Sequence, residues 1–339
     1  MIPEGVHKIR VPLTGSPLGW VNSYVLKTDE GYALVDCGWD MPDALEALRK
    51  GLDELDIKLE DIRRLIITHN HPDHYGLSGR LVQLASCGVT MHRLDAVHIQ
   101  SRYVDMSSLQ AEMRNWLQTH GSPDADLDAM VKGSESILER VNIATPDVEV
   151  EGGETIGAGP LEWRVIWTPG HSVGHICLYE PRLKAFLSGD HILNPISPSI
   201  GLHAQSMGNP LSDYMSSLEG IRDLDVEMVL PAHGDEFPGF RERIDELLRH
   251  HSERLDEICE IIDRDGPQTA YEAATKMRWV GLKDFQNSPP FQRRMATMEA
   301  LAHLELLNGR GRLRRTIADG GVVRYAAPAP PGTAQVASS

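Results

Sequence analysis

The sequence has little cysteine, little aromatic content and no long apolar run. Its four cysteines stand far apart without a C-x-x-C pair, so a disulfide framework is not expected. No apolar stretch approaches the ~18 residues that a membrane helix needs, and the first residues lack a secretory signal. These absences predict a cytoplasmic protein without a membrane partner. They also predict four buried thiols in a reducing compartment: Cys37, Cys87, Cys177 and Cys259.

Basic charge is scarce as well. The 339 residues include 33 Lys and Arg against 49 Asp and Glu, a formal net charge of −16 with histidine neutral. Binding to nucleic acid through counterion release needs clustered basic residues, so nucleic acid is not the expected partner. We interpret the densest basic run, at 310–315, as a solvated face rather than an RNA contact.

What is present is the composition of a folded globular chain. Hydrophobic residues make up 41% and charged residues 24%. At roughly 100–200 residues per domain, the length favours two domains. Strand-like and helix-like stretches alternate over 21–92, and the leucines of 42–55 have helical spacing. Further strands are expected within 146–189 and over 227–230, so the fold class is α/β, built in layers.

Residues 94–145 interrupt this alternation. They contain no clear strand, and three helix-like segments are expected at 94–104, 107–120 and 125–141. Two interpretations of this helical insertion stay open. It supplies additional core, or it forms a lid over an apolar substrate pocket, because methionine-rich surfaces occur at binding sites.

From about residue 240 the pattern changes to long helices. Helices are predicted over 240–264, from a capping-box pattern that begins at Thr269, and over 291–308. A hairpin is predicted within 312–325. Three helices and a terminal hairpin suggest a small winged-helix-like α+β domain. The predicted division is a catalytic domain at 1–240, a winged-helix-like domain at 241–327 and a disordered tail at 328–339.

The strongest pattern is a run of histidine and aspartate directly after an apolar strand. Residues 69–74 read His-x-His-x-Asp-His. His171, Asp190 and His233 each follow an apolar strand in the same way. Strand ends at one edge of a sheet direct their loops the same way, so these four segments can converge on one site.

These residue types suit metal ions. Seven N and O ligands exceed what one tetrahedral ion accepts, so two divalent ions are expected. A carboxylate can bridge two cations, whereas an imidazole normally serves one. The absence of thiolate suits Zn²⁺, with iron or manganese as alternatives. Two ions roughly 3.5–4 Å apart hold a bridging hydroxide at neutral pH and polarise the bond to be cleaved.

This pattern resembles the signature of the metallo-β-lactamase-fold hydrolase superfamily, which includes the glyoxalase II-like enzymes. The resemblance covers about residues 5–240 and implies a four-layer αββα sandwich with a dimetal site at one edge. It also implies that Asp73 orients the hydroxide and carries a proton to the leaving group, so Asp73 and Asp190 are the candidate catalytic residues. The ligand set it implies is His69, His71 and His171 for one metal, Asp73, His74 and His233 for the second, and Asp190 as the bridge.

The same resemblance narrows the range of activities expected for this protein. The predicted function is a dinuclear metal-dependent hydrolase in which the bridging hydroxide attacks an ester or thioester carbonyl of a small, partly apolar substrate. A lactonase is disfavoured, because the lactonases that resemble this site carry a tyrosine shortly after the bridging aspartate, whereas His191 to Asn194 follow it here. A phosphodiesterase or ribonuclease and a non-catalytic metal-bearing protein remain alternatives. The stretch 298–311 resembles the winged-helix module that ends many bacterial hydrolases of this superfamily.

Several further residues are weighed individually. His175 is a candidate for a position behind the metal ligands, hydrogen-bonded to a ligand or its loop, and a purely structural role is the favoured alternative. His191 is expected to be structural and to point away from the site. The expected partner is a small molecule, and a homodimer is a candidate assembly. The candidate substrate contacts are Tyr103, Met113, Trp116 and His203.

Overall fold

The chain divides into two compact units in the computed structural model, which describes residues 2–133, 135–158, 161–282 and 284–328. The first unit contains Met1–Leu109, Ser134–Ser199 and Ser212–Leu248. The second contains Gln110–Gly133, Ile200–Leu211 and Arg249–Ser339. The predicted domains differ from these units, because the prediction placed 110–133 and 200–211 with the residues before 241.

Six strands form the first sheet in chain order. β1 and β2 are antiparallel, as are β2 and β3, while β3, β4, β5 and β6 run parallel. The sequence patterns did not predict β1, which pairs with β2 from Val6 opposite Leu26 to Pro12 opposite Trp20. The strands are β1 (Val6–Pro12), β2 (Trp20–Thr28), β3 (Gly31–Val35), β4 (Ile62–Ile66), β5 (Gly88–His92) and β6 (Val148–Val150).

Five strands form the second sheet in the order β11-β10-β9-β8-β7. β10 and β11 are parallel, and the other neighbours are antiparallel. Two strands that are each antiparallel to β9 must run parallel to one another, so β8, β10 and β11 end at the same edge. The strands are β7 (Thr155–Ala158), β8 (Leu161–Trp167), β9 (Ile176–Glu180), β10 (Ala185–Gly189) and β11 (Met228–Pro231).

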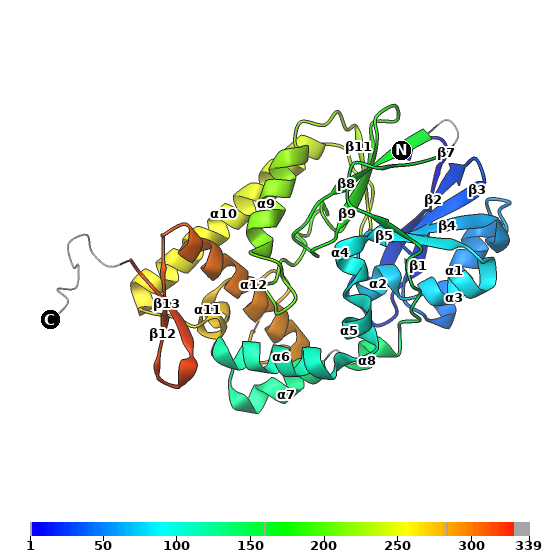
Figure 1. Cartoon of the computed structure of the whole chain (residues 1–339). Coiled ribbons are helices and arrows are strands. Elements are labelled where there is room, and N and C mark those ends of the chain that lie inside the picture. The colour runs from blue at the N-terminus through cyan, green and yellow to red at the C-terminus, as the bar shows by residue number, and fades with distance from the viewer. Residues whose placement is uncertain (1, 134, 159–160, 283, 329–339) are drawn as a thin grey trace. The chain divides into compact units, whose positions relative to one another are not determined.

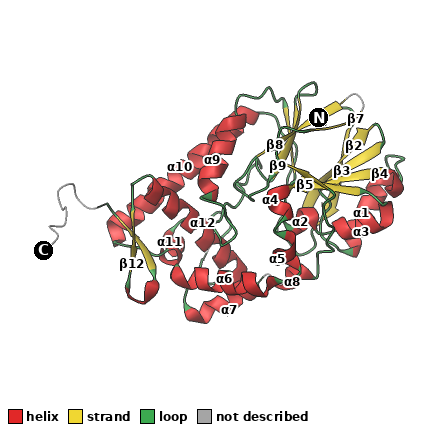
Figure 2. Cartoon of the chain, viewed as in Figure 1, coloured by secondary structure: helices red, strands yellow, loops and turns green. Residues whose placement is uncertain are grey.

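The first unit is layered as helices, sheet, sheet and helices (Figure 2), which confirms the predicted αββα arrangement. Successive side chains of a strand face opposite sides. Leu34 and Leu65 therefore join the core under α1 and α3, whereas Val35 and Ile66 join the core between the sheets. On the far side, Phe240 of α10 packs on Phe186 of β10 with ring centroids 5.0 Å apart. These helices are α1 (Pro42–Asp53), α3 (Ser78–Ala85), α9 (Pro210–Ile221) and α10 (Phe240–Asp265).

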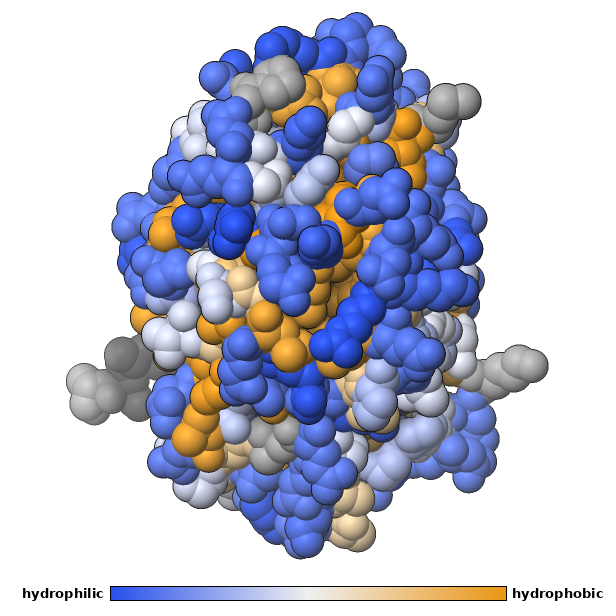
Figure 3. All heavy atoms as spheres, turned by 90° about the vertical axis from the view of Figure 1, so that its right-hand side faces the viewer, coloured by the Kyte–Doolittle hydropathy of each residue, from blue (hydrophilic) through white to orange (hydrophobic). Residues whose placement is uncertain are grey.

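The outer face at the α1 side of Figure 1 is turned to the viewer in Figure 3. It is largely hydrophilic, with an apolar band along its middle. Met41, Leu45 and the charged Arg49 are among the residues that line a groove of about 430 Å³ beside α1. None of the predicted metal ligands lines this groove.

The helical insertion is shared between the two units. Its first helices, α4 (Arg93–Ala96) and α5 (Ile99–Tyr103), belong to the first unit, as does α8 (Glu135–Leu138). Most of α6 (Met106–Thr119) and all of α7 (Asp124–Lys132) belong to the second. Leu117, Leu127 and Met130 are fully buried there, and Arg294 of α12 donates to the carbonyl of Met130. The stretch 110–133 therefore supplies core to the second unit.

The second unit also contains the predicted helices and hairpin. The capping box is confirmed, because Thr269 Oγ1 accepts from the N–H of Glu272 and the Glu272 carboxylate accepts from the N–H of Thr269. The likeness to a winged helix stays a prediction, and the tail from 329 on lies outside the described residues. The elements are the end of α10, α11 (Ala270–Lys276), α12 (Pro290–Gly309), β12 (Arg314–Ile317), the 3₁₀ turn η2 (Asp319–Gly321) and β13 (Val323–Ala326).

All four cysteines are free. Cys37, Cys87 and Cys177 are buried as predicted, whereas Cys259 on α10, beside Arg312, is only partly buried. Across the described ranges, every helix is too short or too polar to span a bilayer. Two short elements complete the first unit: the 3₁₀ turn η1 (Leu59–Asp61) and α2 (Pro72–Tyr75).

Candidate metal centre

Four loops of the first unit carry the predicted ligands. The loop after β4 carries four of them and enters α2, and the ends of β8, β10 and β11 carry the other three. Strand direction brings the last three loops to one edge of the second sheet. The β4 loop reaches the same place because the N–H of Ile176, at the start of β9, donates to the carbonyl of Thr68 at 2.9 Å. The structure therefore brings together all seven residues that the sequence predicted.

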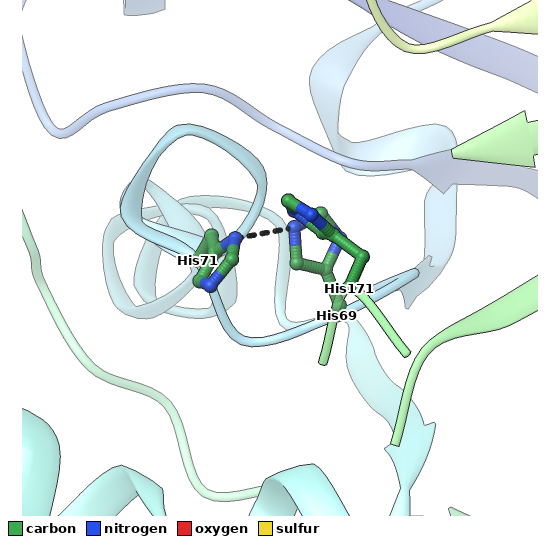
Figure 4. Close-up of side chains that lie close together, drawn as sticks. All are labelled: His69, His71 and His171. Atoms are coloured by element: carbon green, nitrogen blue, oxygen red, sulfur yellow. Dashed lines mark hydrogen bonds between the residues drawn. The ribbon is translucent and has the colours of Figure 1, made fainter. Parts of the chain in front are cut away.

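Three histidines form the first group (Figure 4). His69 Nε2 lies 2.9 Å from His71 Nδ1. The ring of His171 stands edge-on to both, with centroids 4.8 Å from His69 and 4.6 Å from His71. One nitrogen of each ring lies within 4.8 Å of the others. Lone pairs this close repel unless a proton or a cation lies between them, so the group suits a metal ion.

Asp73, His74 and His233 form the second group. His74 Nε2 lies 3.8 Å from Asp73 Oδ1, and His233 Nε2 lies 3.4 Å from Asp73 Oδ2. The short helix α2 provides this arrangement, because it places Asp73 and His74 in consecutive positions after Pro72. The group mixes one carboxylate with two imidazoles, a donor set that suits Zn²⁺.

Asp190 lies between the two groups. Its Oδ2 is 3.4 Å from His171 Nε2 in the first group and 3.6 Å from His74 Nε2 in the second. Its Oδ1 is 3.5 Å from His233 Nε2. A carboxylate in this position can share its oxygens between two cations, which is the bridging position predicted for it.

Hydrogen bonds behind the rings set which nitrogen faces the site. His74 Nδ1 donates to Asp36 Oδ2 at 2.7 Å, and His171 Nδ1 and His233 Nδ1 each donate to a backbone carbonyl at 2.9 Å. His69 Nδ1 lies 3.1 Å from Thr68 Oγ1, whose own proton goes to Asp36. In these four rings Nδ1 is thus held by a hydrogen bond and Nε2 faces the site, whereas His71 turns its Nδ1 toward His69.

Several atoms that face the site are buried without a hydrogen-bond partner. They are the Nε2 atoms of His74, His171 and His233 and the Oδ1 of Asp190. Buried polar atoms are nearly always satisfied, so orphaned acceptors on several converging loops indicate a missing positive partner. These residues therefore fit divalent cations.

Burial and the closeness of neighbouring side chains shift the pKa values of the clustered histidines and aspartates. Burial lowers the pKa of His69 well below its ordinary value, and His74 and His71 lower it further, so the ring is neutral. Burial would raise the pKa of Asp190, but His233 and His74 outweigh it, and this pKa lies well below its ordinary value. Neutral imidazole and ionised carboxylate are the forms that bind metal.

Two supporting carboxylates were not found from the sequence. Asp36 has a left-handed backbone with φ 58°. It directly follows β3, just as the predicted ligands follow their strands, and this position in the sequence could have identified it. Asp95 in α4 accepts from the N–H of Asn70, the hydroxyl of Ser172 and the N–H of Gly174 at 2.7–2.9 Å. It therefore joins the two loops that carry the first group, and no local pattern marks it.

His175 and His191 lie behind the site. His175 Nε2 accepts from the N–H of Asp190 at 3.1 Å, and its Nδ1 lies 2.8 Å from Thr168 Oγ1. Of the two roles considered for His175, these contacts match the position behind a ligand. The ring of His191 packs edge-on against Tyr214, 5.0 Å between centroids, and belongs to none of the ligand groups.

The four candidate substrate contacts belong to different units. Tyr103 lies in the first unit, and its hydroxyl donates to the carbonyl of Asn70, between two ligands. The other three lie in the second unit. Met113 Sδ accepts from Arg294, Trp116 packs beside His120 at 5.1 Å, and His203 opens a turn closed by its own neighbours. Their role as substrate contacts stays a prediction.

Similar proteins are known. A family model described as the metallo-beta-lactamase superfamily matches residues 17–233, and one described as the metallo-beta-lactamase-like C-terminal domain matches 255–328. The chain is 28% identical to the probable metallo-hydrolase YqjP of Bacillus subtilis over 283 residues, which is 82% of this chain and 86% of that protein.

Two solved structures are similar over almost the whole chain. One is a metallo-beta-lactamase family protein of Thermus thermophilus, with a TM-score of 0.82, 31% identity and coverage of 96% of this chain and 100% of that one. The other is a beta-lactamase domain protein of Burkholderia ambifaria, with a TM-score of 0.80, 27% identity and coverage of 96% and 93%. By its sequence match, its fold and its clustered histidines and aspartates, the chain belongs to the metallo-beta-lactamase superfamily of metal-dependent hydrolases.

Proposed function

We propose that this protein is a dinuclear hydrolase of ester or thioester bonds, acting on a small, partly apolar substrate. The observation that carries the proposal is the set of buried, unpartnered Nε2 and carboxylate oxygen atoms around Asp190. Zn²⁺ is the proposed metal, since the donors are imidazole nitrogen and carboxylate oxygen without thiolate.

The candidate ligands would have distinct roles in this reaction. His69, His71 and His171 would hold one ion, and Asp73, His74 and His233 the second, with Asp190 shared. Two such ions would supply a water of lowered pKa and an electrophile for the carbonyl oxygen. Asp73, which remains 17% exposed at its side chain, is the ligand carboxylate best placed to accept a proton and return it to the leaving group.

A carbonyl substrate is favoured over a nucleic acid by the charge of the protein. Its 49 acidic residues outnumber 33 basic ones, so a polyanionic strand would be repelled over most of the surface. A neutral or singly charged small molecule meets no such barrier.

The test is turnover by full-length protein loaded with Zn²⁺. Substrates are acyl thioesters, aryl esters, lactones, bis(4-nitrophenyl) phosphate and single-stranded RNA, side by side. We expect the highest kcat/KM on an ester or thioester, and close to two metal ions per chain by elemental analysis. Preference for the phosphodiester or RNA would instead indicate a nuclease. A metal content near zero would contradict the dinuclear centre.

A matched pair of variants separates the site from general effects. Asp190→Asn removes one charge from the shared position and is expected to lose metal and activity together. Asp223→Asn removes one charge from the surface, where the side chain is 82% exposed, and is expected to keep both. Equal behaviour of the two variants would contradict the role of Asp190.

A further inference from the structure

The loop that carries His233 is held by β2, a strand of the other sheet. β2 pairs with β3 only from Tyr24 onward, so the residues of β2 before Tyr24 extend past the end of β3. The chain after β11 lies along this extension, because the N–H of Asn22 donates to the carbonyl of Ala232 at 2.7 Å. His233 Nδ1 in turn donates to the carbonyl of Trp20 at 2.9 Å. Main-chain groups of β2 thus bond both the ligand ring and the residue before it.

The side chain of Asn22 adds two further bonds to the same loop. Its Nδ2 donates to the carbonyl of Pro231 at 2.9 Å and to the carbonyl of Gly234 at 2.8 Å, one before His233 and one directly after it. Carbonyl oxygens only accept hydrogen bonds, so the amide must present its nitrogen to them. One side chain therefore fixes the loop on both sides of a metal ligand.

The stability of the fold by itself does not account for an asparagine at this position. Asn22 is 1% exposed, and its Oδ1 is buried without a hydrogen-bond partner among the described residues. A buried acceptor without a partner destabilises a folded protein. The carbonyl of Pro231 also has another donor, since the hydroxyl of Tyr24 reaches it at 2.9 Å. What Asn22 adds is the link from this carbonyl across His233 to Gly234.

The bonds from Asn22 reach a ligand of only one of the two groups. His233 belongs to the second group, where its Nε2 lies 3.4 Å from Asp73 Oδ2. The loops of the first group are tied to each other by Asp95, whose carboxylate accepts from both of them. A change at Asn22 therefore affects the second group and leaves this support of the first group in place.

We propose that Asn22 is a positioning residue for the metal ion of the second group, because it holds His233 where its Nε2 meets Asp73. The inference rests on the proposed dinuclear centre and deepens it: the affinity for one ion depends on a residue outside all of the ligand groups. Loss of the amide releases the loop and weakens that ion, while the ion of the first group binds as before.

Zn²⁺ binding to the metal-free, full-length chain tests the proposal without any turnover. Competition with a chromogenic chelator gives a dissociation constant for each of the two ions. Asn22→Ala is expected to weaken one ion about 10- to 100-fold, the usual loss when a residue that orients a ligand is removed, and to leave the other unchanged. Asn22→Asp fills the same volume but carries oxygen where the amide donates. It should show the same selective loss, which separates the lost donors from lost packing.

A double-mutant cycle shows whether Asn22 acts through His233. In the background of His233→Ala, which removes the ligand itself, Asn22→Ala should weaken the remaining binding of that ion no further. A merely structural role of Asn22 would give the same loss in both backgrounds. The matched control is Asn209→Ala, which removes an amide that donates to the carbonyl of Ala302 at 2.9 Å in the second unit, and it should keep both dissociation constants.

Urea unfolding of the metal-free proteins identifies the variants that fold. Equal weakening of both ions by Asn22→Ala would overturn the proposal. So would a folded Asn22 variant, alanine or aspartate, that binds both ions as tightly as the unaltered chain, even if that chain cleaves esters. Selective loss of one ion would support the role of Asn22 even if no ester or thioester is cleaved. Fewer than two ions in the unaltered chain would overturn the dinuclear centre and this inference with it.

Discussion

Asp36 accepts three hydrogen bonds at the exit of β3. Its Oδ1 takes the N–H of Thr68 at 2.8 Å, and its Oδ2 takes the hydroxyl of Thr68 at 2.8 Å and the Nδ1–H of His74 at 2.7 Å. Through the hydroxyl of Thr68 it also sets the tautomer of His69. One carboxylate that binds no metal thus orients a ligand in each of the two groups.

Asp36→Ala is therefore expected to weaken metal binding without removing a ligand. Loss of such a supporting carboxylate costs about 10- to 100-fold in metal affinity. Competition with a chromogenic chelator measures the dissociation constant of Zn²⁺. Asp29→Ala, in the exposed turn between β2 and β3, is the control and should bind as the unaltered chain does. Unchanged affinity in Asp36→Ala would contradict the role of Asp36.

His120 is a buried histidine outside the metal centre. Burial, with a smaller contribution from Arg315, lowers the pKa of His120 to about 4. The unfolded chain takes up this proton near its ordinary pKa of about 6.5. Stability from the neutral ring is therefore complete above pH 6.5 and is lost as the pH falls from 6.5 to about 4, up to about 3 kcal/mol in total.

The measurement is urea unfolding at several pH values between 7 and 4. His120→Gln cannot take up the proton and is expected to show a smaller loss of unfolding free energy over this range than the unaltered chain. The comparison uses the slope with pH, because the substitution also changes packing against Trp116. Identical slopes would show that His120 does not contribute to acid sensitivity.

At the scale of elements, α4 secures the two ligand loops of the first group. Asp95 is fully buried and accepts backbone N–H groups from the β4 loop and the β8 loop. Hydrogen bonds to a buried carboxylate from two loops fix the distance between them. Asp95 therefore ties the loop with His69 and His71 to the loop with His171.

Asp95→Ala should destabilise the fold by about 3 kcal/mol, because it leaves buried N–H groups of Asn70 and Gly174 without acceptors. Thermal unfolding of the metal-free protein measures this loss separately from metal binding. Asp29→Ala, in the exposed turn between β2 and β3, should change the unfolding free energy by less than about 0.5 kcal/mol. A loss in Asp95→Ala as small as this control would mean that the loops are held by other contacts.

At the scale of the whole molecule, the metal centre links folding to ligand binding. Its seven residues span His69 to His233 and meet only in the folded chain, so ions bound there stabilise that state alone. An ion at a thousand times its dissociation constant adds about 4 kcal/mol. Removal of metal with a chelator is expected to lower the melting temperature by several degrees, and added Zn²⁺ should restore it. A melting temperature that does not respond would argue against a site shared by these loops.

Much of this architecture was predictable because its signals are local. Leu48 and Leu52 show the spacing of α1, and the alternating faces of Leu34 and Val35 are read directly from the order of residues. The boundary between the compact units, by contrast, is not marked by any local sequence signal that we used. Met130 is held in the second unit by Arg294, which lies 164 residues further along the chain, and spacing within the insertion does not record that contact.

The sequence by itself determined which histidines and aspartates are the candidate ligands, since such a site depends on residue types placed at strand ends and His69 to His74 stand together in the chain. Only the tertiary structure decided which residues support and extend that site. Asp36 and Asp95 are recognised by the donors that reach them from other loops. A hydrogen bond of this kind is a relation between distant residues, so it exists only once the chain has folded.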